Sequence, residues 1–89
     1  MKAYELLSDE SKWCQGDFAR DVHGEAVNSH SPEAVRWCLT GALSRCYMGY
    51  SDQRARIVAV IGGGHTTTWN DNPLRTYAEV VGLLKRLDI

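Results

Sequence analysis

The sequence contains no long apolar run. The longest one, from Ile57 to Ile61, is far shorter than the roughly 20 residues that a membrane-spanning helix needs. The first residues, MKAYELLSDESKW, also lack the continuous apolar segment and small-residue cleavage site of a secretory signal peptide. These absences predict a cytoplasmic protein that has no membrane partner.

An excess of charge of either sign is also missing. Ten Lys and Arg residues stand against eleven Asp and Glu residues, so the formal net charge is −1. Nucleic-acid-binding proteins usually carry a basic excess, so nucleic acid is not the expected partner. A chain of 89 residues with 44% hydrophobic content can bury one small core. We therefore expect one globular domain over residues 1–89.

The three cysteines do not form a disulfide framework or a metal motif. Their number is odd, and no Cys-x-x-Cys pair occurs. Cys38 and Cys46 would lie two turns apart on one helix, about 12 Å, which is too far to share a metal ion or a disulfide. The sequence predicts reduced thiols, no metal site and no cofactor. Whether Cys14 is reactive stays open.

Helical periodicity predicts a mainly α fold, a compact bundle of about four short helices. A small hairpin or irregular loop is expected between the first and second helices, around Asp21–Gly24. The expected helices are Met1–Leu7, Pro32–Met48, a segment from Ser51 to Ile61, and one beginning at the capping-box pattern Thr76-x-x-Glu79.

The second of these helices has the clearest start signal. Ser31 is a favoured N-cap residue, Pro32 suits the first helical position, and Glu33 suits the positive end of the helix dipole. A stripe of apolar residues follows at three- and four-residue steps: Val35, Cys38, Leu39, Ala42, Leu43 and Cys46. Gly41 would sit inside this helix, where it would allow close approach of another backbone or of Trp13 or Trp69.

The segment Arg54–Gly64 could be a helix or a strand. Read as a strand, RIVAVIGGG resembles the opening of a dinucleotide-binding unit, but the glycines lead into HTTTW, which is poor helix material. We favour a short helix capped at Ser51 and ended by the glycines. The following stretch TTTWNDNPLR is expected to be a loop.

Trp-Cys occurs twice, in KWCQG (Lys12–Gly16) and RWCLTG (Arg36–Gly41). The flanking sequences differ, which argues against an internal repeat. Because each Trp side chain can bury roughly 150–250 Å², both pairs are interpreted as packing residues of the core. Trp13 and Trp69 would then anchor two loops onto the helices.

The whole pattern resembles an uncharacterised family of small bacterial and phage proteins, a domain of unknown function. Three motifs support this resemblance: Trp-x-x-Gly, Trp-Cys-x-x-Gly-Ala-Leu, and Trp-Asn-Asp before a Thr-x-x-Glu-Val helix. The matching residues are Trp13, Gly16, Trp37, Cys38, Gly41, Ala42, Leu43, Trp69, Asn70, Asp71, Thr76, Glu79 and Val80. The resemblance implies a compact helical fold and a bacterial or phage source, but no activity.

With no catalytic motif in view, the expected function is that of a small non-catalytic protein-interaction module. A phage or mobile-element accessory protein fits the size and the implied source, and this includes an inhibitor of a host or defence system such as CRISPR. The candidate binding residues are His65, Trp69, Asn70 and Asp71. The alternative is a small enzyme or small-molecule binder that uses the Gly62–Asp71 loop, with His65 and Asp71 as acid/base candidates. The partner is expected to be a protein, and a homodimer stays open.

Overall fold

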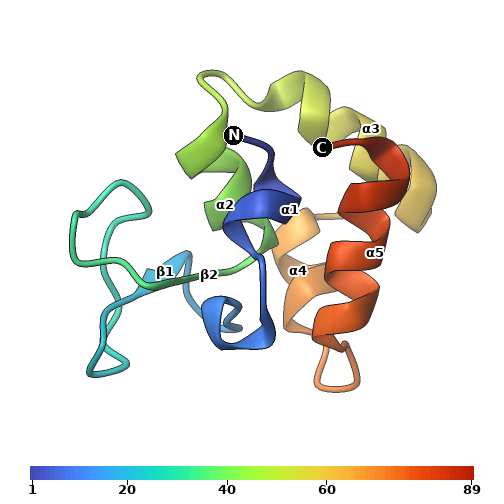
Figure 1. The fold of residues 1–89 in the computed structure, drawn as a ribbon. Coiled ribbons are helices and arrows are strands. Elements are labelled where there is room, and N and C mark those ends of the chain that lie inside the picture. The colour runs from blue at the N-terminus through green and yellow to red at the C-terminus, as the bar shows by residue number, and fades with distance from the viewer.

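The computed structural model describes all residues from 1 to 89 and is mainly α-helical (Figure 1). It contains five α-helices, one 3₁₀ turn (η1) and a two-stranded antiparallel sheet. In chain order these are α1 (Ala3–Leu6), η1 (Glu10–Lys12), β1 (Ala19–Arg20), β2 (Arg36–Trp37), α2 (Leu39–Cys46), α3 (Ser51–Ile61), α4 (Thr66–Asp71) and α5 (Tyr77–Leu87). The mainly α prediction is confirmed, although the bundle has five helices instead of the expected four.

The excursion between the first and second helices is a hairpin-like turn beside the small sheet. One carboxylate oxygen of Asp21 accepts hydrogen bonds from the backbone N–H groups of His23 (2.9 Å) and Glu25 (3.0 Å). Gly24 closes this turn with φ of +81°, a conformation that favours glycine. On the sheet, Ala19 pairs with Trp37. The excursion projects to one side of the helices (Figure 1).

The predicted helix start at Ser31-Pro32-Glu33 is wrong. The Ser31 hydroxyl does accept a hydrogen bond from Glu33 N–H (3.1 Å), but it closes only a turn. Val35 N–H then donates to the carbonyl of Arg20 (2.9 Å), which draws the chain into β2. The central helix α2 therefore begins at Leu39, and Val35 is 41% exposed instead of lying on the buried stripe.

The start of α2 is buried and tightly packed. Cys38, expected inside the helix, is its N-cap, and its sulfur accepts a hydrogen bond from Gly41 N–H (3.2 Å). A Cβ at Gly41 would lie 1.9 Å from the backbone oxygen of Phe18. The expected close approach at Gly41 is thus made by backbone, and not by Trp13 or Trp69.

Residues 51–61 form helix α3, which settles the choice between helix and strand. The N-cap is Tyr50, not Ser51, and it makes no side-chain capping bond. At the other end, Gly62 adopts a left-handed conformation with φ of +88°, the usual way for a glycine to end a helix. The glycine run is therefore a helix stop, as expected, and does not follow a strand.

The prediction of a loop for TTTWNDNPLR is wrong in its first half, because Thr66–Asp71 is helix α4. Tertiary contacts at both ends hold this short helix. The hydroxyls of Thr66 and Thr40 lie 2.7 Å apart, and Asn70 bonds to distant backbone groups described below. Helix α5 begins at the predicted capping box, where Glu79 N–H donates to the Thr76 hydroxyl (3.2 Å) and Thr76 N–H donates back to the Glu79 carboxylate (3.0 Å).

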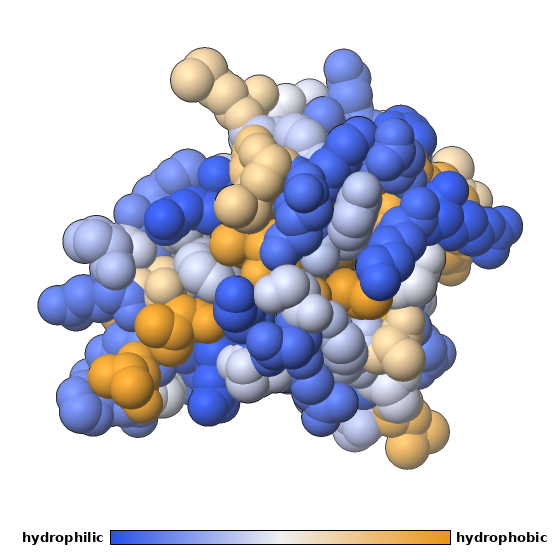
Figure 2. All heavy atoms as spheres, viewed as in Figure 1, coloured by the Kyte–Doolittle hydropathy of each residue, from blue (hydrophilic) through white to orange (hydrophobic).

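One apolar cluster of 14 buried residues draws on helices α1, α2, α3 and α5. Its large, fully buried members are Leu7, Leu39, Leu43, Ile57, Val80, Leu84 and Ile89. On the surface, apolar side chains appear as separate patches among polar ones. In Figure 2 they lie over the hairpin excursion, in the middle of the view over the helices, and at the turn between α4 and α5.

The two ends of the chain meet at one end of the bundle (Figure 1). Ala3 N–H donates a hydrogen bond to the carbonyl of Ile89 (2.6 Å), and the Lys2 ammonium lies 3.1 Å from the Asp88 carboxylate. Helix α1 is thereby fixed against α5. None of the helices has the length and apolar character that crossing a membrane requires.

Candidate functional site

Asn70, one of the candidate binding residues, is fully buried and satisfied inside the protein. Its carboxamide oxygen accepts hydrogen bonds from the indole N–H of Trp13 (2.8 Å) and from Leu39 N–H (3.1 Å). Its amide nitrogen donates to the carbonyl of Cys14 (3.2 Å) and to the carboxylate of Asp71 (2.9 Å). An amide group has two donors and two acceptor positions, so Asn70 has none left for a ligand.

Asp71 and Gln15 extend this network to the surface. One oxygen of Asp71 accepts a hydrogen bond from Gly16 N–H (3.0 Å). The Gln15 side chain donates to the carbonyls of Asn70 (2.8 Å) and Asn72 (2.9 Å). These bonds join residues about 55 positions apart. The Trp-Asn-Asp motif therefore fastens the WCQG segment to the end of α4.

The two Trp-Cys pairs are part of the same arrangement. Trp13 and Trp37 form a parallel bridge, and Cys14 N–H donates to the carbonyl of Trp37 (3.1 Å). Both pairs therefore lie side by side as core packing, although Trp37 lies on β2 and not on the central helix. Burial raises the pKa of the Cys14 thiol to about 11 and also raises the pKa of Cys38. At neutral pH these thiols are held protonated, which is the inert form.

Trp69, the third Trp, lies on α4 and is half-buried instead of sitting in a loop. The Arg75 guanidinium lies 3.8 Å from the ring centre, and its Nε donates to the Trp69 carbonyl (3.0 Å). Arg75 is itself paired with Glu79 (3.0 Å). This stacking holds the Trp69 ring in one orientation.

The Trp69 side chain lines a groove between α3 and α5, which we call the α3–α5 groove. Its volume is about 330 Å³. The lining residues are Val60, Ile61, Trp69, Ala78, Glu79, Gly82, Leu83 and Arg86. Val60 is 40% exposed, and a Cβ added at Gly82 would meet no atom within 4 Å. The groove is thus apolar, open and unfilled by the protein's own side chains.

His65, the last candidate, is exposed and lies just before α4, at its N-cap position. Asp71 is the last residue of α4. Six residues of helix separate them by about 9 Å along the axis. The structure therefore brings Trp69, Asn70 and Asp71 together around the end of α4, but places His65 at the opposite end.

The search for relatives gives one family. A family model described as "Family of unknown function (DUF6197)" matches residues 1–87. The chain belongs to this family. No curated protein and no solved structure matches it.

Membership in DUF6197 agrees with the resemblance to a domain of unknown function. Because the match covers nearly the whole chain, the buried network around Asn70 and the α3–α5 groove lie within the family region. The family's description assigns no activity.

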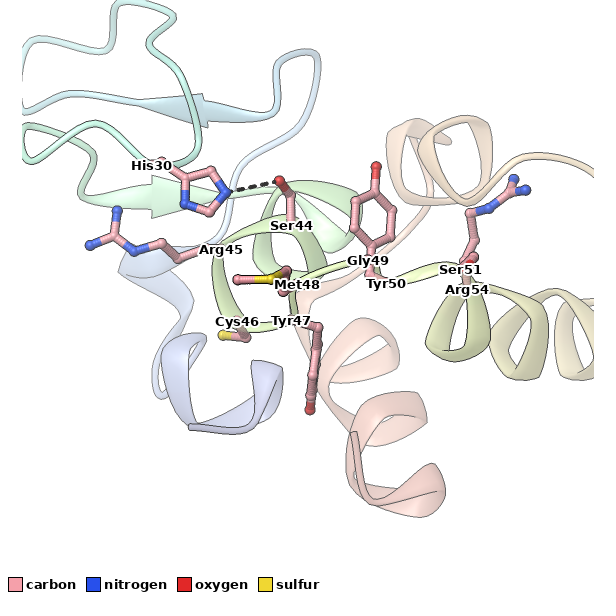
Figure 3. A pocket seen from close by; sticks show the side chains of 10 residues that line it. All are labelled: His30, Ser44, Arg45, Cys46, Tyr47, Met48, Gly49, Tyr50, Ser51 and Arg54. Carbon is pink, nitrogen blue, oxygen red and sulfur yellow. Dashed lines mark hydrogen bonds between the residues drawn. The ribbon is translucent and has the colours of Figure 1, made fainter.

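A larger hollow, which the sequence analysis missed, lies where α2 is followed by α3. We call it the α2–α3 groove, and its volume is about 770 Å³. It is lined by His30, Ser44, Arg45, Cys46, Tyr47, Met48, Gly49, Tyr50, Ser51 and Arg54 (Figure 3). The cluster of basic and aromatic residues between positions 45 and 54 was a local signal that could have indicated it.

No three side chains of the His, Cys, Asp and Glu types come together in an arrangement that could hold a metal ion. Three ion pairs are present, at Lys2–Asp88, Arg20–Asp17 and Arg75–Glu79. All three connect residues outside the α2–α3 groove.

Proposed function

We propose that this protein is a small non-catalytic interaction module that binds a protein partner through the α3–α5 groove. The observation that carries the proposal is the position of Gly82, an unfilled site on α5 next to the fixed ring of Trp69. Half-buried aromatic side chains beside apolar hollows are typical anchors of protein–protein contacts.

Packing within the protein does not require a glycine at Gly82. A glycine inside a helix costs about 0.8–1 kcal/mol relative to alanine. At Gly41 the close approach of the Phe18 backbone leaves no room for a side chain, so glycine is needed there despite this cost. At Gly82 the space beyond the backbone is open. A partner side chain inserted between Val60 and Trp69 would use this space.

The rim of the groove suits a protein partner. Its lining includes Glu79 and Arg86, one charged residue of each sign. An apolar floor with a polar rim is the usual anatomy of a protein-binding patch. The occupant we propose is an apolar side chain of the partner, held by Trp69 and Val60.

Catalysis through the Gly62–Asp71 segment receives less support. General acid–base chemistry needs its two groups to converge on one pocket, whereas His65 and Asp71 lie at opposite ends of α4. The hollow beside Asp71 is lined by Thr67, Thr68, Asp71, Asn72 and Pro73 and includes no histidine. A role as a phage or mobile-element accessory protein, or as an inhibitor, stays a hypothesis within the interaction class.

The test is an affinity pull-down with the tagged protein and two matched variants. Gly82→Leu fills the groove with a residue that favours helix, so the fold is retained and the partner is lost. Ala59→Leu adds a similar side chain at an exposed position of α3 that does not line the groove, and the partner is retained. Equal recovery of the partner by wild type and Gly82→Leu would contradict the proposal.

A second copy of the chain is the remaining candidate partner. Size-exclusion chromatography across a range of concentrations would detect it. A dimer that Gly82→Leu converts to monomer, with no change for Ala59→Leu, would identify the α3–α5 groove as a self-association surface. A concentration-independent monomer directs the search to a different protein.

A further inference from the structure

The α2–α3 groove has a charge unlike that of the whole protein. The chain carries a net charge of −1. The groove lining, in contrast, includes Arg45, Arg54 and His30 but no aspartate or glutamate. The nearest acidic residue in sequence is Asp52, in the first turn of α3, which does not line the groove.

The two arginines of this groove are not neutralised by the protein. Arg54 is exposed and makes no ion pair and no side-chain hydrogen bond. Arg45 bonds through one guanidinium nitrogen to the backbone carbonyls of Ser29 (3.1 Å) and Ser31 (3.3 Å), which holds it in place without cancelling its charge. An arginine guanidinium has five N–H donors. Most of the donors of both residues therefore face no protein acceptor.

The surface between these charges includes an apolar and an aromatic side chain. In Figure 3, Arg45 and Arg54 lie at opposite sides of the groove, with Ser44, Met48 and Tyr50 between them. Met48 is completely exposed, and Tyr50 is half-buried. Methionine and tyrosine are common in adaptable protein-binding surfaces. A flexible apolar contact is thus flanked by positive charge on both sides.

We propose that the α2–α3 groove binds an acidic peptide segment of a protein partner, with carboxylates at Arg45 and Arg54 and an apolar residue against Met48 and Tyr50. A single inorganic anion would fill only a small part of about 770 Å³ and would leave Met48 and Tyr50 uncovered. Nucleic acid would need a longer basic track than two arginines and a histidine supply. This surface is separate from the α3–α5 groove.

The experiment is fluorescence anisotropy with a labelled peptide in which glutamate alternates with leucine. Wild type is expected to bind it, and binding should weaken as salt is raised. Arg54→Glu is expected to weaken binding about tenfold or more, because a charge-assisted contact becomes repulsive. The matched control is Arg36→Glu, an exposed residue on β2 outside the groove that undergoes the same change of charge.

Folding of each variant is checked by circular dichroism, and Arg54 is suitable because its exposed side chain makes no hydrogen bond or ion pair within the protein. Three outcomes would overturn the proposal. The first is that folded wild type does not bind the peptide. The second is that wild type and Arg54→Glu bind it equally well. The third is that a single-stranded oligonucleotide binds more tightly than the acidic peptide. A peptide with lysine in place of glutamate should not bind.

Discussion

The indole N–H of Trp13 donates a hydrogen bond to the carboxamide oxygen of Asn70 at 2.8 Å. The same oxygen accepts from Leu39 N–H at the start of α2. One buried side chain thus joins the first Trp-Cys pair, the central helix and α4. This explains why a Trp-Asn-Asp motif can have a structural role far from its own place in the sequence.

Asn70→Ala is therefore expected to destabilise the fold. It leaves the N–H groups of Trp13 and Leu39 and the carbonyl of Cys14 without their partner, and each buried unsatisfied group costs about 1–3 kcal/mol. We expect a loss of at least about 3 kcal/mol in the free energy of unfolding, measured by urea denaturation. Asn72→Ala removes only one exposed hydrogen bond, from Leu74 N–H, and should change it by about 0.5–1.5 kcal/mol. Similar losses for the two variants would contradict the assigned network.

The two helix glycines should respond in opposite directions to alanine. At Gly41 the new Cβ would lie 1.9 Å from the oxygen of Phe18, so backbone must move, and a loss of roughly 1–3 kcal/mol or more is expected. At Gly82 nothing lies within 4 Å, so alanine should stabilise by about 0.8–1 kcal/mol. Denaturation midpoints of the two variants give the comparison. Destabilisation by Gly82→Ala would show that this glycine serves the fold itself.

The three thiols should differ in reactivity in the native state. Burial raises the pKa of Cys14 to about 11, so its reactive thiolate is scarce at neutral pH. Cys46 is only partly buried and should be alkylated first by iodoacetamide, as measured by mass spectrometry of peptides. Modification of Cys14 before Cys46 would contradict the assignment of Cys14 as an inert packing residue.

The raised pKa of Cys14 also has a consequence for stability. The folded state holds the thiol proton more tightly than the unfolded state, whose thiol has the ordinary pKa of 9.0. The contribution of this group to stability is complete below pH 9 and is lost as pH rises toward 11. Cys14→Ser should reduce this alkaline loss in urea denaturation series. An unchanged alkaline profile would show that Cys14 is not the group responsible.

Glu79 should make the fold sensitive to acid. The backbone N–H and hydroxyl of Thr76, together with Arg75, lower the pKa of the Glu79 carboxyl below its usual value of 4.5. This stabilisation is present above the unfolded pKa and is lost as pH falls through the lower folded pKa. Glu79→Gln should flatten the acid side of the stability curve measured by urea denaturation. Glu33→Gln, at an exposed glutamate that accepts no hydrogen bond, is the control.

Local sequence signals predicted the elements that depend on local chemistry. The capping box at Thr76 and Glu79 was predicted correctly because both partners lie within one helical turn. The helix ending at Gly62 was predicted for the same kind of reason, since only the left-handed preference of glycine is involved.

The incorrect predictions concern segments whose local structure is determined by contacts with residues far away in the sequence. Ser31 has every local mark of an N-cap, but pairing of the following residues with Ala19 and Arg20 pulls the chain into β2. Helix α4 is rich in threonine, a weak helix former, and forms because Asn70 and Thr66 bond to the region around α2. The same limit applies to the candidate site residues. The sequence next to Asn70 does not indicate whether its side chain is buried or exposed.

The hydrogen bonds of the Asn70 side chain can form only late in the synthesis of the chain. Trp13, Cys14 and Leu39 leave the ribosome well before Asn70, so their polar groups must be satisfied by water until the last third of the chain emerges. Closing loops of 31 and 57 residues at one side chain makes the final step a long-range one. The nascent chain should therefore remain protease-sensitive until α5, which supplies Val80 and Leu84 to the same core, has also cleared the exit tunnel, and then become protected in a single event.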